Sequence, residues 1–285
     1  MSTSITDVTP SASAETPQTI DVTNSLTATP ATLSRDEEEK TRREAAQAHL
    51  KGKKIVFCLP GNVYSRQFLV SWSGLLAACI NRGITPIMSQ DYSSVVHFAR
   101  AKTLGADVLA GVQQKPFRGQ IPDYDYIVFI DSDVIFSPED VFHLLETPHD
   151  VTAGLYAMED RKNFATVKVQ DLEFFKKHGT FEFLSIDTVE QMLKTAKIND
   201  QGQERYLPVS YSGMGFMAIK ANVFERLPYP WFYSELTEFI DAKGQMVRDM
   251  SSEDVSFCNN LLKHLGLKVM LDLDVRVGHL KSFII

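Results

Sequence analysis

Stretches of mostly apolar residues alternate with amphipathic stretches through the first half of the chain. Short continuous apolar runs are typical of strands that are covered on both faces of a sheet. Stretches with apolar residues at helical spacing predict helices that lie on such a sheet. The alternation therefore predicts a small doubly wound α/β unit. Strands are expected at residues 53–62, 84–88, 126–130 and 150–156, and helices at residues 64–82, 93–104 and 138–146.

The spacing within the first two helical stretches predicts which side chains face the sheet. The first stretch has a broad apolar face and ends at Gly83, and the second places Arg100 beside its apolar residues. Glycine is favoured just past the end of a helix. The side chains expected to point inward are Phe68, Leu69, Trp72, Leu75, Leu76, Cys79 and Ile80 in the first, and Val95, Val96, Phe98 and Ala99 in the second.

The pattern becomes less regular after residue 156. Short strand-like runs and further helical stretches are interrupted by polar segments, of which residues 199–205 are the longest loop. The helix that follows residue 252 is expected to bury Leu261, Leu262 and Leu265, with Gly266 past its end. Strands are predicted at 165–169, 181–186, 216–219 and 268–273, and a helix at 188–196.

The N-terminal region differs from the rest in composition. Residues 1–33 are rich in Ser, Thr, Ala and Pro without apolar periodicity, which predicts a disordered tail. Ser34 and Glu37 form a candidate capping box for a peripheral helix that ends near Leu50. We therefore expect residues 51–285 to form the functional domain, with a nucleotide-binding half (51–150) and an acceptor-binding, catalytic half (151–285).

Length, composition and charge limit the classes of protein to which this chain can belong. With 285 residues and 44% hydrophobic content, the chain can bury a full core. It has no apolar run of bilayer-spanning length and no signal-peptide pattern, so a cytoplasmic location is the expectation. Cys58, Cys79 and Cys258 are widely spaced among apolar neighbours, which favours reduced core thiols. A formal charge of -7 disfavours general binding to nucleic acid or acidic lipid.

The strongest chemical signal is Asp131-Ser132-Asp133, directly after the apolar run 126–130. Burying unpaired carboxylates is costly, so two of them at the carboxyl end of a buried strand favour a compensating cation. Mg²⁺ or Mn²⁺ binds one or two carboxylates together with phosphate oxygens. The alternative is a solvated loop that caps the next helix, but that helix has its own start signal at Ser137-Pro138.

Two later segments add candidate residues for catalysis. Gly213 and Gly215 would let the backbone approach a ligand, although a tight turn or β-bulge explains the glycines equally well. Asp254, or alternatively Glu253, is a candidate general base at a predicted helix start. The helix macrodipole favours acids in a first turn regardless of function, so this alternative stays open.

Charged and turn residues elsewhere suggest how an anionic ligand would be held. His279 would complete a mixed oxygen and nitrogen ligand set for Mn²⁺ if it met the two aspartates, although a single histidine is more often structural. Lys281 could neutralise a leaving diphosphate. Arg100 could bind a diphosphate, but a surface role on its helix is the alternative. A base or ribose could lie over the turn at Pro60-Gly61.

The order of these segments resembles that of glycosyltransferases of the GT-A fold. That family has an Asp-x-Asp after a central strand, a glycine-rich loop, an x-Glu-Asp at a helix start and a C-terminal histidine. In this chain the four are Asp131-Ser132-Asp133, Ser212-Gly213-Met214-Gly215, Ser252-Glu253-Asp254 and His279, within residues 53–281. The resemblance implies a Rossmann-like half with a central mixed sheet. It departs at Leu59-Pro60-Gly61-Asn62, which lacks the acids that many members place near the base.

Carried over to these positions, the resemblance implies a metal-dependent transfer of sugar from a nucleotide-diphosphate sugar, with UDP as the favoured nucleotide, to a hydroxyl of a sugar, glycan or protein. Asp133 and His279 would bind Mn²⁺ or Mg²⁺, Asp131 would contact the metal or ribose, and Asp254 would be the base of an inverting enzyme. The other expected donor-binding residues are Pro60, Gly61, Asp91, Arg100, Ser132, Gly213, Gly215 and Lys281, and the expected acceptor-binding residues are Tyr211, Met214 and Trp231. Trp231 belongs to an aromatic cluster at residues 228–232 that could stack on an acceptor sugar, although core or lid packing explains the cluster equally well.

Three other functions remain possible from the sequence. A haloacid-dehalogenase-like phosphatase also has an Asp-x-Asp after a hydrophobic strand, but no later lysine and acidic pair completes that site here. A nucleotidyltransferase with the same half-fold is disfavoured by His279. An inactive sugar-binding protein of the same fold is the non-enzymatic alternative.

Overall fold

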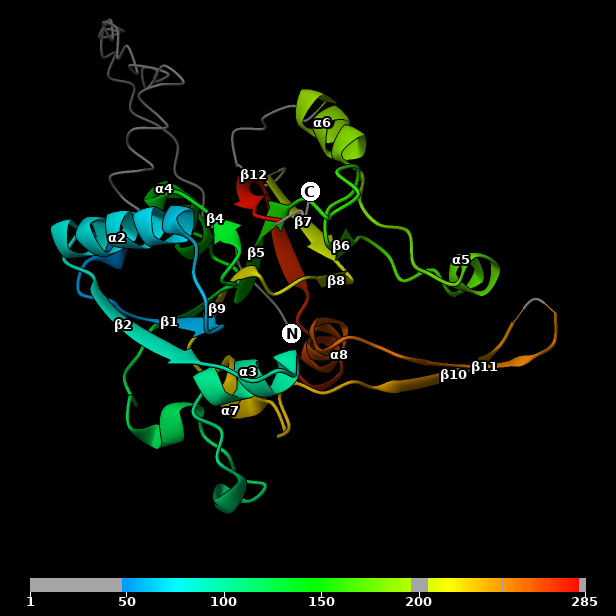
Figure 1. Ribbon diagram of the computed structural model, residues 1–285, viewed down its shortest axis with the longest axis horizontal. Helices are drawn as coiled ribbons and strands as arrows, with labels where there is room; N and C mark the ends of the chain where they lie inside the picture. The colour runs from blue at the N-terminus through cyan, green and yellow to red at the C-terminus, as the bar shows by residue number, and fades with distance from the viewer. Residues whose placement is uncertain (1–47, 196–204, 242, 282–285) are drawn as a thin grey trace, which may run out of the picture. The chain divides into compact units, whose positions relative to one another are not determined.

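The computed structural model describes residues 48–195, 205–241 and 243–281 (Figure 1). These residues belong to one compact unit. The predicted tail at 1–33, nearly all of the predicted helix at 34–50 and most of the predicted loop at 199–205 lie outside the described residues.

A mixed sheet of eight strands forms the centre of the described part of the chain, and it gives an α/β protein. Strand β1 pairs in parallel with β2 and β3, and β12 pairs in parallel with β5. Strand β9 is antiparallel to both β3 and β5 and joins the two parallel groups. The strand order is β2 (Thr85–Asp91), β1 (Lys54–Pro60), β3 (Tyr126–Ile130), β9 (Phe216–Lys220), β5 (Val151–Tyr156), β12 (Val269–His279) and β4 (Val134–Ile135), and β7 (Tyr206–Val209) also pairs with β12.

Each face of the sheet has its own hydrophobic core. Because side chains alternate along a strand, Ile55 and Phe57 of β1 pack into one core while Val56 and Cys58 pack into the other. Helices α2 (Arg66–Asn81) and α4 (Pro138–Leu145) cover the first face. Residues of α7 (Val223–Arg226) and α8 (Glu253–Asn260) belong to the second core. The predicted α/β class with a central mixed sheet is confirmed.

The predicted facing of several helical residues is wrong. In α2 the buried apolar side chains are Phe68, Leu75 and Cys79, while Leu69 and Ile80 are exposed. In α3 (Val96–Thr103) the inward residues are Ala99, Arg100 and Thr103. Helix α3 turns a charged residue toward the protein because Arg100 pairs with two carboxylates there. Against prediction, Val95, Val96, Phe98 and Leu262 are exposed.

The remaining elements lie mostly in the second half. Residues 181–185 were expected to be a strand but are irregular, and helix α6 (Ile186–Thr195) starts close to the predicted position. Helix α5 (Leu172–His178) precedes it, and the π-helical turn Leu261–Leu265 extends α8. Two small sheets pair β6 (Thr166–Val167) with β8 (Tyr211–Ser212) and β10 (Leu236–Ile240) with β11 (Met246–Met250).

Two further sequence predictions, on the state of the cysteines and on membrane-spanning segments, can be compared with the structure. Cys58, Cys79 and Cys258 are free thiols and all three are buried, as predicted. No helix in the described ranges has both the length and the apolar character to cross a bilayer.

Candidate functional site

The Asp131 to Asp133 loop is fixed by backbone hydrogen bonds to two distant segments. The Asp131 N–H donates to the Gly215 carbonyl at 2.9 Å, and the Leu280 N–H donates to the Asp133 carbonyl at 2.7 Å. Strand β4, which follows the loop, pairs antiparallel with the end of β12, so that Val134 lies opposite His279. The strand ends thus bring together the Asp-x-Asp, the glycine loop and the C-terminal histidine.

Asp133 lies between two cationic groups. Its Oδ2 is 3.1 Å from His279 Nε2 and 2.9 Å from Lys281 Nζ. Partial burial would raise the pKa of Asp133, but hydrogen bonds from His279 and Lys281 outweigh it and lower the pKa to about 2. His279 donates its other ring N–H, at Nδ1, to the Ala157 carbonyl at 2.8 Å. The hydrogen bond with Asp133 raises the pKa of His279 against the effect of its partial burial.

The donor atoms of Asp133 and His279 and the distance between them are compatible with a divalent ion. In an octahedral shell with bonds of about 2.1 Å, neighbouring ligand atoms lie about 3 Å apart, close to the 3.1 Å between Asp133 Oδ2 and His279 Nε2. The Ala157 carbonyl fixes the imidazole as the outer partners of metal-bound histidines do. No group of three or more His, Cys, Asp or Glu side chains gathers as a metal site in the described ranges. Any ion here would need further ligands from a substrate and water.

Asp131 has a different partner from Asp133. Its two carboxylate oxygens accept from the two terminal nitrogens of Arg100 at 2.9 and 3.1 Å. Arg100 Nε donates to Glu253 Oε1 at 3.1 Å. Burial would lower the pKa of Arg100, but the two carboxylates raise it, so the guanidinium stays charged. Arg100 was predicted on the helix surface or at a diphosphate, and the structure instead places it at 3% exposure as the link between Asp131 and Glu253.

The glycine loop packs closely against Tyr156, which the sequence analysis did not select. A Cβ at Gly213 would lie 2.0 Å from the Tyr156 hydroxyl oxygen, and one at Gly215 would lie 3.0 Å from Asp131 Oδ2. The Gly215 N–H also donates to the Tyr156 hydroxyl at 3.2 Å. The glycines are therefore required by the approach of a tyrosine and of Asp131. Tyr156 ends β5, and the carboxyl end of a strand is a signal that could have identified it.

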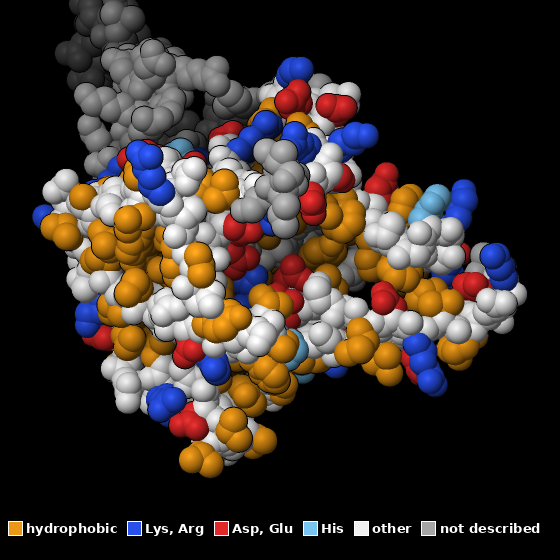
Figure 2. All heavy atoms as spheres, in the orientation of Figure 1, with side chains coloured by type: hydrophobic (Ala, Val, Ile, Leu, Met, Phe, Trp, Pro, Cys, Tyr) orange, Lys and Arg blue, Asp and Glu red, His pale blue; other side chains and the backbone are white. Residues whose placement is uncertain are grey.

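Asp254 lies at the start of α8, one residue after the Glu253 that binds Arg100. Its carboxylate accepts hydrogen bonds from the Ser252 hydroxyl and, at 2.8 Å, from the Val255 N–H. Burial raises the pKa of Asp254 despite the hydrogen bond from Ser252. Burial raises the pKa of the Tyr156 hydroxyl, and the negative charges of Asp131 and Asp254 raise it further. Acidic side chains line a hollow near the middle of the face shown in Figure 2.

The predicted nucleotide-side residues gather at the ends of β1 and β2. The Gly61 N–H donates to the Asp91 carbonyl at 3.0 Å, and a Cβ at Gly61 would lie 2.9 Å from the Ser132 Cβ. With φ at +152°, Gly61 is also in a backbone conformation that other residues rarely adopt. Pro60 is buried beside it. Sequence analysis missed Gln90, whose side-chain amide donates to the Gly61 carbonyl.

Two of the predicted acceptor-binding residues are core residues. Trp231 is 1% exposed and packs edge-on against Phe224 with ring centroids 5.8 Å apart. Met214 is fully buried. Phe232 is 3% exposed beside Trp231, so the buried rings of the cluster at residues 228–232 pack in the core. Tyr211 is 8% exposed, and burial raises the pKa of its hydroxyl, with a further increase from the negative charge of Asp254.

Comparisons with known proteins identify no family. No protein-family model matches the chain, and no curated protein matches it. Among solved structures the chain is similar to A197 from STIV, with 15% identity and a TM-score of 0.42 over 82% of this chain and 96% of that chain. The function is therefore inferred from the side chains of this chain itself.

Proposed function

We propose that this protein is a glycosyltransferase of GT-A type that moves a sugar from a nucleotide-diphosphate sugar to a hydroxyl acceptor. The observation that carries the proposal is the meeting of Asp133 and His279 at 3.1 Å, although the two are 146 residues apart along the chain. Beside them, Arg100 joins the first acid of the Asp-x-Asp to the acid pair of α8. The resemblance implied that Asp131, Asp133 and His279 would lie together; Asp133 and His279 meet, and Asp131 is held by Arg100.

Asp133 and His279 would hold the metal, and Lys281 would move to the diphosphate. Bound Mn²⁺ or Mg²⁺ would offset the negative charge that develops on the leaving diphosphate. Lys281 Nζ is 2.9 Å from Asp133 Oδ2, so its side chain already lies where an anionic group of the donor would be neutralised. A divalent ion that took the place of Lys281 beside Asp133 would free the Lys281 ammonium group to bind the phosphate oxygens.

Asp254 is proposed as the general base. The acceptor hydroxyl oxygen forms a bond to the anomeric carbon while the bond from that carbon to the diphosphate oxygen breaks, and the hydroxyl proton passes to Asp254. A carboxylate with a raised pKa suits this role because its affinity for the proton is higher. Glu253 is the weaker candidate, since its Oε1 is committed to Arg100.

Asp131 and Ser132 are proposed to contact the ribose and nucleotide. The bidentate pair with Arg100 fixes the Asp131 carboxylate and leaves its side chain 29% exposed. Ser132 lies against Gly61 at the end of β1, so a ribose there would touch both segments. Ligands of open α/β sheets bind outside the carboxyl ends of the strands, which is where these residues lie.

A thermal-shift panel tests the proposal. UDP, GDP, CMP and dTDP sugars are each added to the full chain with and without Mn²⁺, and the melting temperature is measured. Stabilisation by one nucleotide sugar that requires the ion is expected, because ligands that bind only the folded state raise its stability. No ion-dependent shift with any of the four classes would contradict the proposal. A shift without detectable transfer to any acceptor would favour the inactive sugar-binding alternative.

A further inference from the structure

The segment between α3 and β3 exposes an apolar tip. Val108, Leu109 and Val112 are 91%, 93% and 82% exposed, the highest values among the large exposed hydrophobic residues of the described ranges. Val108 and Leu109 belong to the short 3₁₀ helix Val108–Ala110, and Val112 follows it. Figure 2 shows hydrophobic side chains at the lower end of the molecule, where Figure 1 draws this segment. We call Val108, Leu109 and Val112 the apolar tip.

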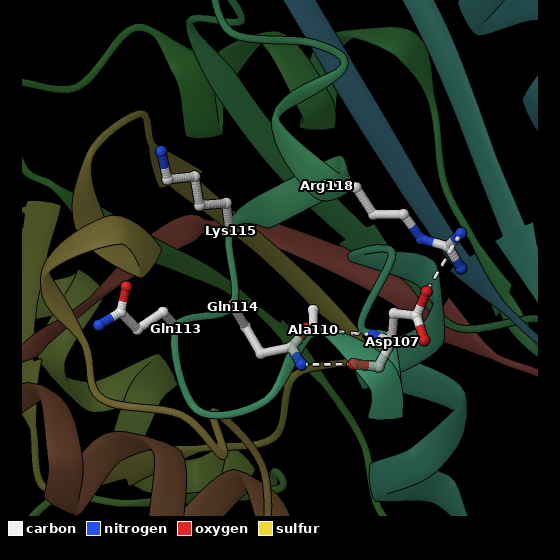
Figure 3. Close-up of a pocket in the computed structure, with 6 residues that line it drawn as sticks. All are labelled: Asp107, Ala110, Gln113, Gln114, Lys115 and Arg118. Carbon is white, nitrogen blue, oxygen red and sulfur yellow. Dashed lines mark hydrogen bonds and ion pairs between the residues drawn. The ribbon is translucent and has the colours of Figure 1, made fainter.

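The loop that presents the apolar tip is closed at its base. The Gln114 side-chain amide donates to the Asp107 carbonyl at 2.5 Å and accepts from the Asp107 N–H at 3.1 Å (Figure 3). It also donates to the Gly111 carbonyl at 2.9 Å. The Phe117 N–H donates to the Leu104 carbonyl at 2.6 Å, and the Phe117 ring is buried. Hydrogen bonds within the loop, together with the buried Phe117 at its base, thus fix the backbone conformation that exposes the apolar tip.

Basic side chains lie beside the apolar tip. Residues 101–122 contain three basic residues and one acidic residue in a chain whose net charge is -7. Lys115 and Arg118 line a cavity of about 190 Å³ at the base of the loop, together with Asp107 and Gln114 (Figure 3). Arg118 lies 3.5 Å from Asp107, whereas Lys115 makes no ion pair within the part of the chain that the structure describes.

We propose that this loop docks the protein onto a lipid surface with anionic head groups. The apolar tip enters the acyl region while Lys115 and Arg118 contact head-group phosphates. Insertion of a few apolar side chains and attraction between basic residues and anionic lipid add together in surface binding. The acidic remainder of the chain does not prevent it, because charges beyond the Debye length of about 8 Å are screened at physiological salt.

A lipid surface fits the tip better than a partner protein does. A stable protein interface buries about 800 Å² on each partner and is dominated by Trp, Tyr and Arg anchors. The apolar tip has three aliphatic side chains and no aromatic residue. The neighbouring Lys115 and Arg118 line a small cavity, and their positive charges suit contact with phosphate groups at the boundary of an apolar lipid layer.

Vesicle flotation of the full chain tests the docking proposal independently of sugar transfer. The probes are vesicles of phosphatidylcholine alone and of equal parts phosphatidylcholine and phosphatidylglycerol. We expect the wild type to float only with the anionic vesicles. Val108→Ser, Leu109→Ser and Val112→Ser together should lower the partition coefficient at least about tenfold, and Lys115→Gln about fivefold.

A matched control changes three exposed apolar residues elsewhere. Leu69→Ser, Val70→Ser and Ile80→Ser on α2 alter side chains that are 60–69% exposed and should leave flotation unchanged. Melting temperatures of all variants confirm folding. Wild-type protein that stays in solution with the anionic vesicles overturns the proposal, as does equal loss of flotation in the control. Self-association that the tip variant abolishes, without flotation of the wild type, would assign the tip to a protein contact instead.

Discussion

Asp131 and Asp133 are two residues apart but serve different partners. The loop turns at this point, since the Val134 N–H donates to the Asp131 carbonyl at 3.1 Å. Arg100 holds Asp131 with two hydrogen bonds, whereas Asp133 meets His279 and Lys281. Arg100 fixes both oxygens of Asp131, whereas Asp133 lies beside His279, whose imidazole is a potential metal ligand, so Asp133 is the carboxylate that we propose as a ligand of the divalent ion.

Replacing Asp133 with alanine is expected to abolish metal-dependent donor binding. The substitution removes the only carboxylate of the proposed ligand pair, and the half-exposed position predicts a stability loss of less than about 1 kcal/mol. Calorimetric titration of the nucleotide sugar with Mn²⁺ measures the effect. Asp123→Ala, which removes an exposed carboxylate paired with Lys54, is the control. Unchanged affinity in Asp133→Ala would remove Asp133 as a ligand.

Replacing Asp254 with asparagine should leave donor binding intact and suppress transfer. The amide keeps the size of the side chain and cannot take the acceptor proton, so turnover should fall by about 10²-fold or more. Initial rates and donor titrations on the same preparation separate the two effects. Retained turnover would show that Asp254 is not the base, and Glu253→Gln would then be the next variant.

At the scale of elements, electrostatics decides how α3 packs. Val95, Val96 and Phe98 are left exposed so that Arg100 can point inward between Asp131 and Glu253. A buried guanidinium is acceptable only because both carboxylates bind it. Helix α3 thereby couples the end of β3 to the start of α8.

Removing the buried cation should destabilise the protein strongly. Arg100→Met leaves two carboxylates without their partner, for which a loss of about 3–5 kcal/mol in the free energy of unfolding is expected. Chemical denaturation measures it. Arg248→Ala, which breaks an exposed pair with Glu238, should cost less than about 1 kcal/mol. Similar losses in both variants would contradict a special role for Arg100.

The glycine loop and Tyr156 should behave as one unit. Gly213→Ala places a methyl group 2.0 Å from the Tyr156 hydroxyl oxygen, and such overpacking costs about 1–3 kcal/mol. Tyr156→Phe removes that oxygen, so the double variant should lose less stability than the sum of the single variants. Additive losses would mean that Gly213 is required for another reason, such as a close ligand.

At the scale of the whole molecule, the central strands create the candidate site. Strand β9 joins two parallel groups by antiparallel pairing, and the end of β12 pairs with β4 directly after the Asp-x-Asp. His279, near the C-terminal end of the described residues, therefore lies beside Asp133, which is 146 residues earlier in the chain.

Deleting residues 1–33 is expected to leave the melting temperature within about 2 °C of the full chain. Their composition predicts little burial, and a 1 kcal/mol change would shift the melting temperature by roughly 2–4 °C in a domain of this size. Differential scanning calorimetry of both chains gives the answer. A fall of many degrees would show that these residues contribute to the folded state.

The amino-acid sequence by itself determined the local features of this protein. The apolar run 126–130, the cap at Ser137 and the alternation of strands and helices each depend on neighbouring residues, and all of them are present in the structure. The layered α/β class follows from that local alternation.

Tertiary structure alone decided which side chains meet. Arg100 turned inward, Trp231 and Met214 entered the core, and Tyr156 came to lie over the glycine loop. Each outcome depends on partners far away in the sequence, for which helical or strand periodicity carries no information. The convergence of Asp133 with His279 is a product of strand order, because only the pairing of β4 with β12 fixes their distance.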